Sequence, residues 1–553
     1  MRGRYIDLME KTLGAYTREH IERYFADVRR DGLTEHGFPR LTASIGILIA
    51  KGRRRELLPL FVEMMDFCCE SFSRNVKAAN DFSVKEIIFC IKELIAAEAV
   101  ERSRIDLWLS DIARLDRTLG YNVYAKHESD KVHNWAAFTA CSEQLRQVMG
   151  LCDSRDFIDV QVASQLQWLD ENGMYRDPNN PMVYDLVTRG LFAVLLFHGY
   201  DGKYKNEMDS ALRSAGLHTL RLQSVTGEIA FGGRSNQFLH NEAHHALICE
   251  YEARRYAAEG DTELAGRFKT SANIAVDNIE YWLAEPTVRH IKNRFPLESR
   301  HGCENYAYFD KYMITVASFL YVAYLFCDDT IEAAERDFTP YVYSTSADFH
   351  KLILSASGYT LELDTDADRH YDSTGLGRIH RLGAPSWLCL SCPATDTPNY
   401  RLISEPPRAL SIAHGRLVDG EWKFTTDGKY TVLSAEADSC SASALVEDNL
   451  GIRGEYLIAP SGIVGITLCG NADGEVGLML PAFVTDGEHE GNIIYNPTQL
   501  IVECDGWACM YSTDGEISPL GFEAENRNGR YAAYVAHGER GVRVRIHIFK
   551  KDN

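Results

Sequence analysis

Apolar residues recur with a helical period from the N-terminus to about residue 329. The segments 57–65, 87–95 and 314–326 are examples, each bounded by short polar breaks. Roughly a dozen such segments follow one another, each as long as a typical globular helix. We therefore expect residues 1–340 to form a helical domain.

The pattern changes after Pro340 to short alternating runs bounded by Gly, Asp and Asn. Such runs occupy 359–363, 430–434, 462–468, 500–504 and 542–549. Because no helical segments separate them, an antiparallel β-sandwich is favoured over a parallel sheet. We expect this second domain to span residues 341–553.

Periodicity alone does not choose among a bundle, a solenoid and a closed ring of helical hairpins for the first domain. We find no repeat of fixed period, which disfavours a solenoid. The length of 553 residues agrees with two domains, since a single core rarely grows beyond roughly 250–300 residues.

Composition and charge exclude several classes of function. The 58 Lys+Arg and 79 Asp+Glu residues give a net charge of −21, which repels nucleic acid and anionic membranes. The N-terminus lacks a signal-like apolar region, and we expect no membrane span, a cytoplasmic location and reduced thiols among the 14 Cys residues. Assembly into a homo-oligomer is left open.

Four polar clusters interrupt the helical pattern. The first, His133, Asn134 and Trp135, stands at the start of an apolar helix. Its imidazole and amide can hydrogen-bond a sugar, and the indole offers a flat apolar face. The alternative is that Asn134 caps the helix and that Trp135 belongs to the core.

The second cluster, residues 170–185, is a long loop that contains Tyr175 and leads into Tyr184. Its Gly, two Pro and two Asn residues make it rigid, and loops this polar often carry functional side chains. The alternative for each Tyr is a core residue with a satisfied hydroxyl.

The third cluster, residues 232–245, is the densest. Its candidate residues are Arg234, Asn236, Gln237, His240, Asn241 and Glu242. We expect Ser235 or Asn236 to cap a helix on which Asn236, His240 and His244 share one face. The two His residues have metal-ligand spacing, but the segment is not H-E-x-x-H, so we expect neither a metal nor another cofactor.

The fourth cluster, residues 298–312, contains Arg300, His301, Glu304 and Tyr306. It combines a cation, an imidazole and phenols, which suits acid–base chemistry, and the alternative is a salt-bridged helix start. Four such clusters in one domain favour a shared cleft. We find no P-loop, nucleophile elbow or dinucleotide-binding motif.

These residues resemble the heparinase II/III-like superfamily. His133-Asn134-Trp135 is similar to its Asn-rich helix signature, and the segment from Asp170 to Tyr184 is similar to its Tyr-bearing motif, with Asp185 in place of the usual His. His380 corresponds to a His at a strand entrance of its sandwich. The resemblance implies an (α/α) toroid followed by a β-sandwich, acting on uronic-acid sugars.

The leading hypothesis is a lyase that cleaves uronic-acid oligosaccharides by β-elimination. Asn134, Asn241 or Arg234 would polarise the carboxylate, Tyr184 or one of His133, His240 and His301 would act as base, and Tyr184 would protonate the leaving oxygen. The alternatives are an exo-β-glucuronidase that uses Glu242 and Glu304, and a noncatalytic sugar-binding protein. The remaining candidates for substrate binding are Trp135, Tyr175, Asn236, Gln237, Arg300, Tyr306 and His380.

Overall fold

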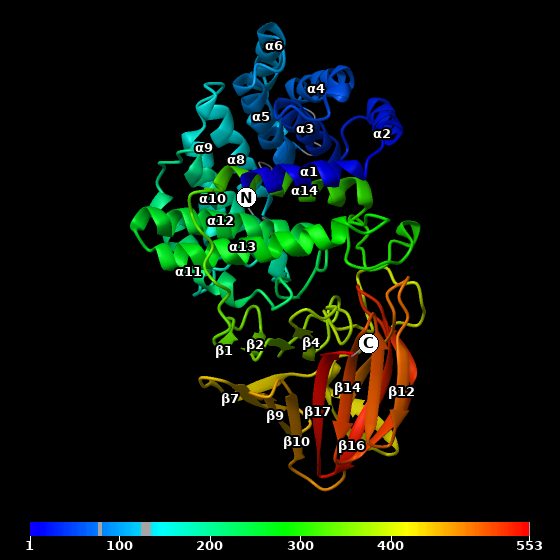
Figure 1. The fold of residues 1–553 in the computed structure, drawn as a ribbon. Helices are drawn as coiled ribbons and strands as arrows, with labels where there is room; N and C mark the ends of the chain where they lie inside the picture. The colour runs from blue at the N-terminus through cyan, green and yellow to red at the C-terminus, as the bar shows by residue number, and fades with distance from the viewer. Residues whose placement is uncertain (76–79, 123–133, 552–553) are drawn as a thin grey trace. The chain divides into compact units, whose positions relative to one another are not determined.

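The computed structural model describes residues 1–75, 80–122 and 134–551, so the candidate His133 lies outside the described residues. Helices precede strands along the chain (Figure 1). The helices are α1 (Arg2–Gly14), α2 (Arg18–Asp31), α3 (Gly37–Ala50), α4 (Leu58–Ser73), α5 (Asn80–Ala96), α6 (Arg102–Ala113), α7 (Arg117–Gly120), α8 (Trp135–Val148), α9 (Arg155–Leu166), α10 (Met182–Phe197), α11 (Lys205–Arg221), α12 (His240–Glu259), α13 (Thr262–Leu283) and α14 (Phe309–Phe326).

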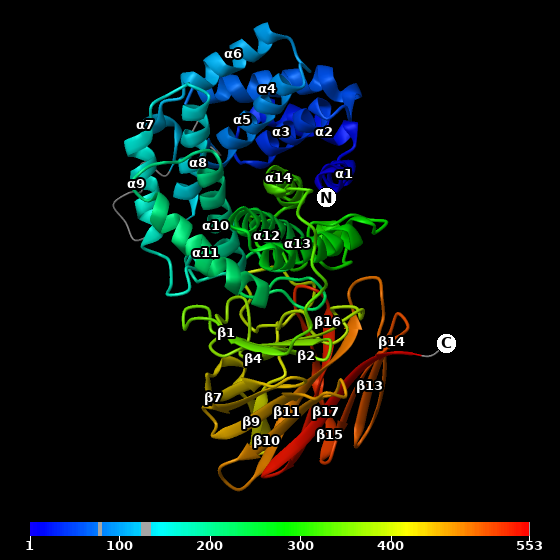
Figure 2. The ribbon, with the colours of Figure 1, turned by 60° about the vertical axis from the view of Figure 1, so that its left-hand side comes forward.

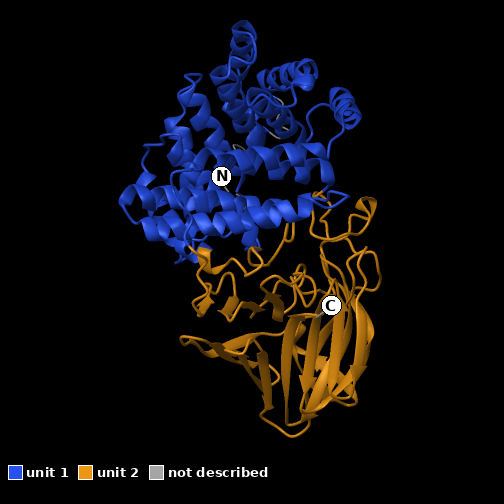
Figure 3. Cartoon of the chain, viewed as in Figure 1, with its two compact units in different colours: residues 1–219, 239–290, 308–334 blue, residues 220–238, 291–307, 335–553 orange. Residues whose placement is uncertain are grey.

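The chain divides into two compact units, each built from three segments (Figure 3). Unit 1 consists of Met1–Thr219, Leu239–His290 and Tyr308–Ala334. Unit 2 consists of Leu220–Phe238, Ile291–Ala307 and Glu335–Asn553. The boundary predicted at 340/341 falls between the last helix and the first strand, whereas two loops of the helical half belong to unit 2.

Six helices of unit 1 form a closed ring, which we call the inner ring. In ring order they are α3, α5, α8, α10, α12 and α14, and α14 packs against α3 to close it. Other helices pack outside: α1 contacts α14, α9 contacts α8, and α13 lies beside α12 in both ribbon views (Figures 1 and 2). The ring resolves the choice that periodicity left open.

Burial explains which helices form the inner ring. Thirteen of the 14 residues of α3 are buried, whereas α2 buries only Ile21, Phe25 and Val28, on one face. Helices that are apolar all round belong inside, and amphipathic helices cover them.

Helix α14 bears on the expectation that the chain has no membrane span. It has 18 residues with a mean hydropathy of 1.2, which suffices by length and composition. However, 72% of it is buried within the protein, where it contacts α1, α3 and α12. Its place in the inner ring accounts for its composition.

The strands of unit 2 are all antiparallel in the described part of the chain. They are β1 (Tyr341–Ser344), β2 (Lys351–Ala356), β3 (Tyr359–Asp364), β4 (Gly375–Arg381), β5 (His414–Val418), β6 (Glu421–Phe424), β7 (Tyr430–Ala437), β8 (Ala442–Asp448), β9 (Ile452–Ile458), β10 (Val464–Gly470), β11 (Glu475–Thr485), β12 (Asn492–Asn496), β13 (Gln499–Cys504), β14 (Trp507–Thr513), β15 (Glu516–Glu525), β16 (Arg530–Glu539) and β17 (Gly541–Lys550).

Three sheets make up unit 2. The largest has eight strands in the order β12-β13-β14-β17-β10-β9-β8-β7, and sheets of five (β15-β16-β11-β5-β6) and four strands (β1-β2-β3-β4) pack against it. Buried residues alternate with more exposed ones along β8, β9 and β10, as expected for strands with one face in the core. This agrees with the predicted antiparallel sandwich.

Candidate active site in the helical unit

A pocket of about 50 Å³ lies within unit 1 where the inner-ring helices begin. Each of the six helices contributes at least one residue. The lining residues are His36, Arg40, Phe82, Asn134, Phe138, Tyr184, Val187, His240, His244, Tyr312, Thr315 and Phe319. Three residues that the sequence singled out as catalytic, Asn134, Tyr184 and His240, therefore meet in one place.

The pocket lies at the helix N-termini. His36 and Asn134 occupy the N-cap positions of α3 and α8, Tyr184 is the third residue of α10, and His240 is the first of α12. Helix N-termini carry partial positive charge and backbone N–H groups that lack partners within the helix. This arrangement favours an anionic ligand.

The side chain of Asn134 is not used for capping, because no cap hydrogen bond is present although the residue occupies the N-cap position. Its backbone N–H donates to Asp177 Oδ1 at 3.0 Å, which ties the start of α8 to the loop of the second cluster. The amide side chain lines the pocket instead.

The loop before Tyr184 is held by Asp185. Both carboxylate oxygens of Asp185 accept hydrogen bonds from Arg189, at 2.8 and 2.5 Å, and Oδ1 also accepts from the backbone N–H of Tyr175 at 2.8 Å. Asp185 and Arg189 are fully buried. This contact fixes the loop to α10 next to Tyr184.

Aromatic and imidazole rings surround His240. Its ring centroid lies 5.2 Å from that of Tyr312 and 5.7 Å from that of His244, which in turn lies 3.7 Å from the ring of Phe319. Burial, together with the nearby cation Arg40, holds the pKa of His244 well below its usual range. His244 is therefore a neutral imidazole near pH 7.

His36 is in a similar environment, also buried and close to Arg40. Burial is the largest cause of the low pKa of His36, and the charges of Arg40 and Lys311 lower it further. Burial also lowers the pKa of Lys311. Neutral imidazoles in a desolvated pocket can accept a proton, as a general base must.

None of the described residues that line the pocket is Asp or Glu. In the same part of the chain, no group of three or more His, Cys, Asp or Glu side chains is placed to hold a metal ion. The polar groups that this lining offers are imidazoles, phenols, one amide, one guanidinium and the hydroxyl of Thr315.

Four other candidates lie in unit 1 but are not part of the described lining of the pocket. Tyr175 is fully buried and its hydroxyl donates to Gln165 Oε1 at 2.7 Å. Asn241 and Glu242 are buried in the first turn of α12, and Trp135 is half-buried with its ring 5.3 Å from that of Phe82.

Glu304 and His301 lie in unit 2, where their polar groups are engaged in the fold. Glu304 Oε1 accepts from Arg527 Nη2 and from the backbone N–H of Ser235, both at 2.7 Å. His301 Nε2 lies 2.8 Å from the carbonyl oxygen of Asn526, and burial lowers the pKa of His301 to about 4.

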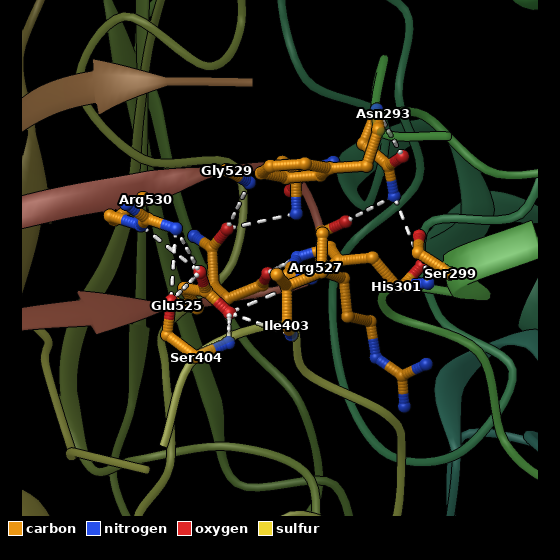
Figure 4. Close-up of polar contacts among 12 residues, drawn as sticks. Asn293, Ser299, His301, Ile403, Ser404, Glu525, Arg527, Gly529 and Arg530 are labelled. Atoms are coloured by element: carbon orange, nitrogen blue, oxygen red, sulfur yellow. Dashed lines mark hydrogen bonds and ion pairs between the residues drawn. The ribbon is translucent and has the colours of Figure 1, made fainter. Parts of the chain in front are cut away.

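The surroundings of His301 are built from hydrogen-bonded pairs (Figure 4). Asn293 Nδ2 donates to the carbonyl oxygens of His301 and Arg527, at 3.2 and 2.8 Å. Glu525 accepts from Ser404 and from Arg530. These contacts are those of residues that hold loops to strands.

The remaining candidates also lie in unit 2. His380 is fully buried, with its ring nitrogens 2.8–2.9 Å from the hydroxyls of Thr226, Ser224 and Ser391. Arg300 donates to two backbone carbonyls, and Tyr306 is 37% exposed. Arg234, Asn236 and Gln237 precede α12, so the prediction that Asn236 begins this helix and shares a face with His240 is wrong.

Sequence reasoning did not single out His36, Arg40, Phe82 and Thr315 as parts of a site, and it placed His244 and Tyr312 in polar clusters without giving them a catalytic or substrate-binding role. His36 and Arg40 stand in an apolar segment that looks like an ordinary helix start, and they meet Tyr312 and Thr315 only because the ring closes. The signal that the sequence offered was an Arg four residues after a His at the start of an apolar segment.

Comparison with known proteins gives matches in structure only. No protein-family model matches the chain, and no curated protein does. Heparinase III superposes with a TM-score of 0.53 at 8% identity over 93% of this chain and 77% of that chain. A heparan sulfate lyase from Pedobacter heparinus (TM-score 0.37, 10% identity, 89% of this chain and 76% of that chain) and a family 88 glycosyl hydrolase from Bacteroides vulgatus (0.39, 10%, 59% and 99%) also match.

The similarity to heparinase III spans both units and follows the same order, helices first and antiparallel sheets second. The chain therefore has a heparinase-like fold, an α-helical ring followed by a β-sandwich.

Proposed function

We propose that the protein is a carbohydrate-active enzyme that cleaves uronic-acid oligosaccharides by β-elimination in the pocket of unit 1. The observation that carries this proposal is the meeting of Asn134, Tyr184 and His240 in one pocket whose described lining contains no carboxylate. The heparinase-like fold agrees with it but does not identify the reaction, because one fold hosts many chemistries.

The pocket contains a group for each step of the elimination. The amide of Asn134 would hydrogen-bond the substrate carboxylate, which stabilises negative charge as the C5 proton leaves. His240 would take that proton as the general base. Tyr184 would donate its phenolic proton to the oxygen at C4, so that the C4–O bond breaks and a C4=C5 double bond forms.

Hydrolysis is the second candidate function. A glycosidase uses two carboxylates, about 5–5.5 or 6.5–9.5 Å apart. Glu242 is absent from the described lining of the pocket, and Glu304 is ion-paired with Arg527 in unit 2. The contacts of these two residues favour elimination over hydrolysis by an exo-β-glucuronidase. The assay described next also tests the third possibility, a noncatalytic sugar-binding protein.

The test is to incubate the full chain with a panel of uronic-acid oligosaccharides and to follow two signals. Elimination gives ultraviolet absorbance from the unsaturated product together with new reducing ends, whereas hydrolysis gives reducing ends alone. Binding without either product would support the noncatalytic role and contradict the proposal.

Tyr184→Phe should abolish turnover while the protein stays folded. Tyr5→Phe is the matched control, because Tyr5 is a buried Tyr of unit 1 outside the pocket lining whose hydroxyl donates to Glu250 at 2.8 Å. It should lose about 1 kcal/mol of stability and keep its activity. An active Tyr184→Phe variant would remove Tyr184 from the mechanism.

A further inference from the structure

Arg40 is the one guanidinium in the described lining of the pocket, and it is held in a fixed position. Its Nε donates to Glu86 Oε1 at 3.3 Å and its Nη1 donates to Thr315 Oγ1 at 2.8 Å. The guanidinium carbon lies 5.4 Å from the ring centroid of Phe319 and 5.9 Å from that of Phe138. Arg40 is only 3% exposed.

One amino group of this guanidinium, Nη2, has no hydrogen-bond partner among the residues that the structure describes. A guanidinium has five N–H donors in a planar fork. The side chain as a whole is buried, yet Nη2 is not among the enclosed atoms that lack a partner, so this arm opens onto the pocket. A fixed guanidinium arm that opens onto a pocket can bind a ligand that accepts hydrogen bonds.

The charges behind Arg40 do not balance within the group that contacts it. Glu86 is shared by Arg40 and by Lys85, whose Nζ lies 2.5 Å from Glu86 Oε1, and Ser318 donates to the same oxygen at 2.7 Å. All three charged side chains are buried. Two cations on one carboxylate leave one net positive charge beside the pocket.

Burial lowers the pKa of Arg40, as expected for a desolvated cation, and the charge of Glu86 opposes this change. An uncompensated buried charge is costly, and an anion bound in the pocket would remove that cost. Neither Asp nor Glu supplies this anion from the lining within the described ranges.

We infer that Arg40, aimed by Glu86 and Thr315, is the binding site for the carboxylate of the substrate and the residue that selects a uronic acid over a neutral sugar. This inference rests on the proposed function for the identity of the sugar. The free arm of the fork hydrogen-bonds one carboxylate oxygen, and the aromatic rings of Phe138 and Phe319 exclude water from that contact. Asn134 and the helix N-termini add hydrogen-bond donors at the same end of the inner ring.

The experiment measures the binding of D-glucuronate and D-glucose to the full chain by isothermal titration. D-glucuronate is not a substrate for elimination, because its C4 oxygen carries no leaving sugar. Arg40→Gln should weaken glucuronate binding by about 10- to 100-fold, the size of a lost charge-assisted hydrogen bond. Binding of glucose should be unchanged.

Two further variants keep the test decisive if Arg40→Gln does not fold. Thr315→Val removes one of the two contacts that aim the guanidinium but keeps its charge, and it should weaken glucuronate binding severalfold without changing glucose binding. Arg213→Gln is the matched control, because Arg213 is a half-exposed Arg of unit 1 paired with Glu259 and lies outside the pocket lining.

The two claims fail separately. If folded Arg40 and Thr315 variants bind glucuronate as the wild type does, or if the wild type binds none, the inference on Arg40 is overturned even when unsaturated products form. If glucuronate binding depends on Arg40 but no oligosaccharide is eliminated, the carboxylate site stands and the proposed reaction fails.

Discussion

Replacement of Glu304 tests whether this residue stabilises the fold or takes part in the reaction. In unit 2, Glu304 forms an ion pair with Arg527 at 2.7 Å, and the two side chains are 3% and 1% exposed. Burial alone would lower the pKa of Arg527, but the charge and the hydrogen bond of Glu304, together with smaller contributions from Tyr400 and Cys392, raise that pKa overall. Glu304→Gln keeps the size and shape of the side chain but leaves the guanidinium of Arg527 without its counter-charge.

Breaking a buried pair on one side costs about 3–5 kcal/mol. Since about 1 kcal/mol shifts the melting temperature of a domain of roughly 200 residues by about 2–4 °C, Glu304→Gln should lower the melting temperature of unit 2 by roughly 6–20 °C. Asp396→Asn is the control, because Asp396 pairs with Arg369 in the same unit but both are about half-exposed. It should cost at most about 1 kcal/mol.

The assay combines thermal unfolding, followed by circular dichroism, with turnover measured well below the melting transition. We expect Glu304→Gln to be less stable than the wild type and to retain wild-type turnover while it is folded. A variant that melts as the wild type does but has lost turnover would refute the reasoning and move the chemistry to Glu304.

Three further predictions concern unit 1 and the substrate. Asp185→Asn removes the charge that pairs with Arg189 in the buried wall beside Tyr184, so it should cost about 3–5 kcal/mol in thermal unfolding and lower turnover, and an unchanged melting curve would contradict this. Burial lowers the pKa of His245 from 6.5 to about 3, so the unfolded state binds more protons between these values and wild-type stability should fall as the pH drops below 6.5. Urea unfolding at several pH values should show that the free energy of unfolding falls less for His245→Gln than for the wild type as the pH drops. If this free energy falls equally steeply with pH in both proteins, His245 is not the cause. If the enzyme is exo-acting on short oligosaccharides, small products should accumulate before the viscosity of a uronic-acid polymer falls, whereas an early loss of viscosity would indicate endo-cleavage.

Much of the fold follows from hydrophobic period. The predicted helical segment 87–95 lies within α5, and the predicted strands 359–363, 430–434 and 500–504 lie within β3, β7 and β13. The spacing of hydrophobic residues indicates which side chains face a core, and this is a local property of the chain. It does not report which helices close into a ring, because that depends on packing between segments far apart in the sequence.

The candidate site, like the fold, could be predicted where the signal is local and not where it depends on segments far apart in the sequence. Asn134, Tyr184 and His240 stand out because polar residues begin otherwise apolar helices, and the inner ring brings them together. Arg40 stands one helical turn after His36 at a helix start that looks ordinary, and its partners Glu86 and Thr315 are 46 and 275 residues away in the sequence. The third and fourth clusters look like parts of helical hairpins, yet residues 220–238 and 291–307 belong to the β-rich unit, where Phe238 and Ile291 form an antiparallel bridge.

The most direct test of the central claim is to run the cleavage of a uronic-acid oligosaccharide in water labelled with heavy oxygen and to weigh the products by mass spectrometry. Elimination breaks the C4–O bond without water, so we expect products whose masses sum to that of the substrate and that carry no label. Products that together gain one labelled water would show hydrolysis and contradict the account.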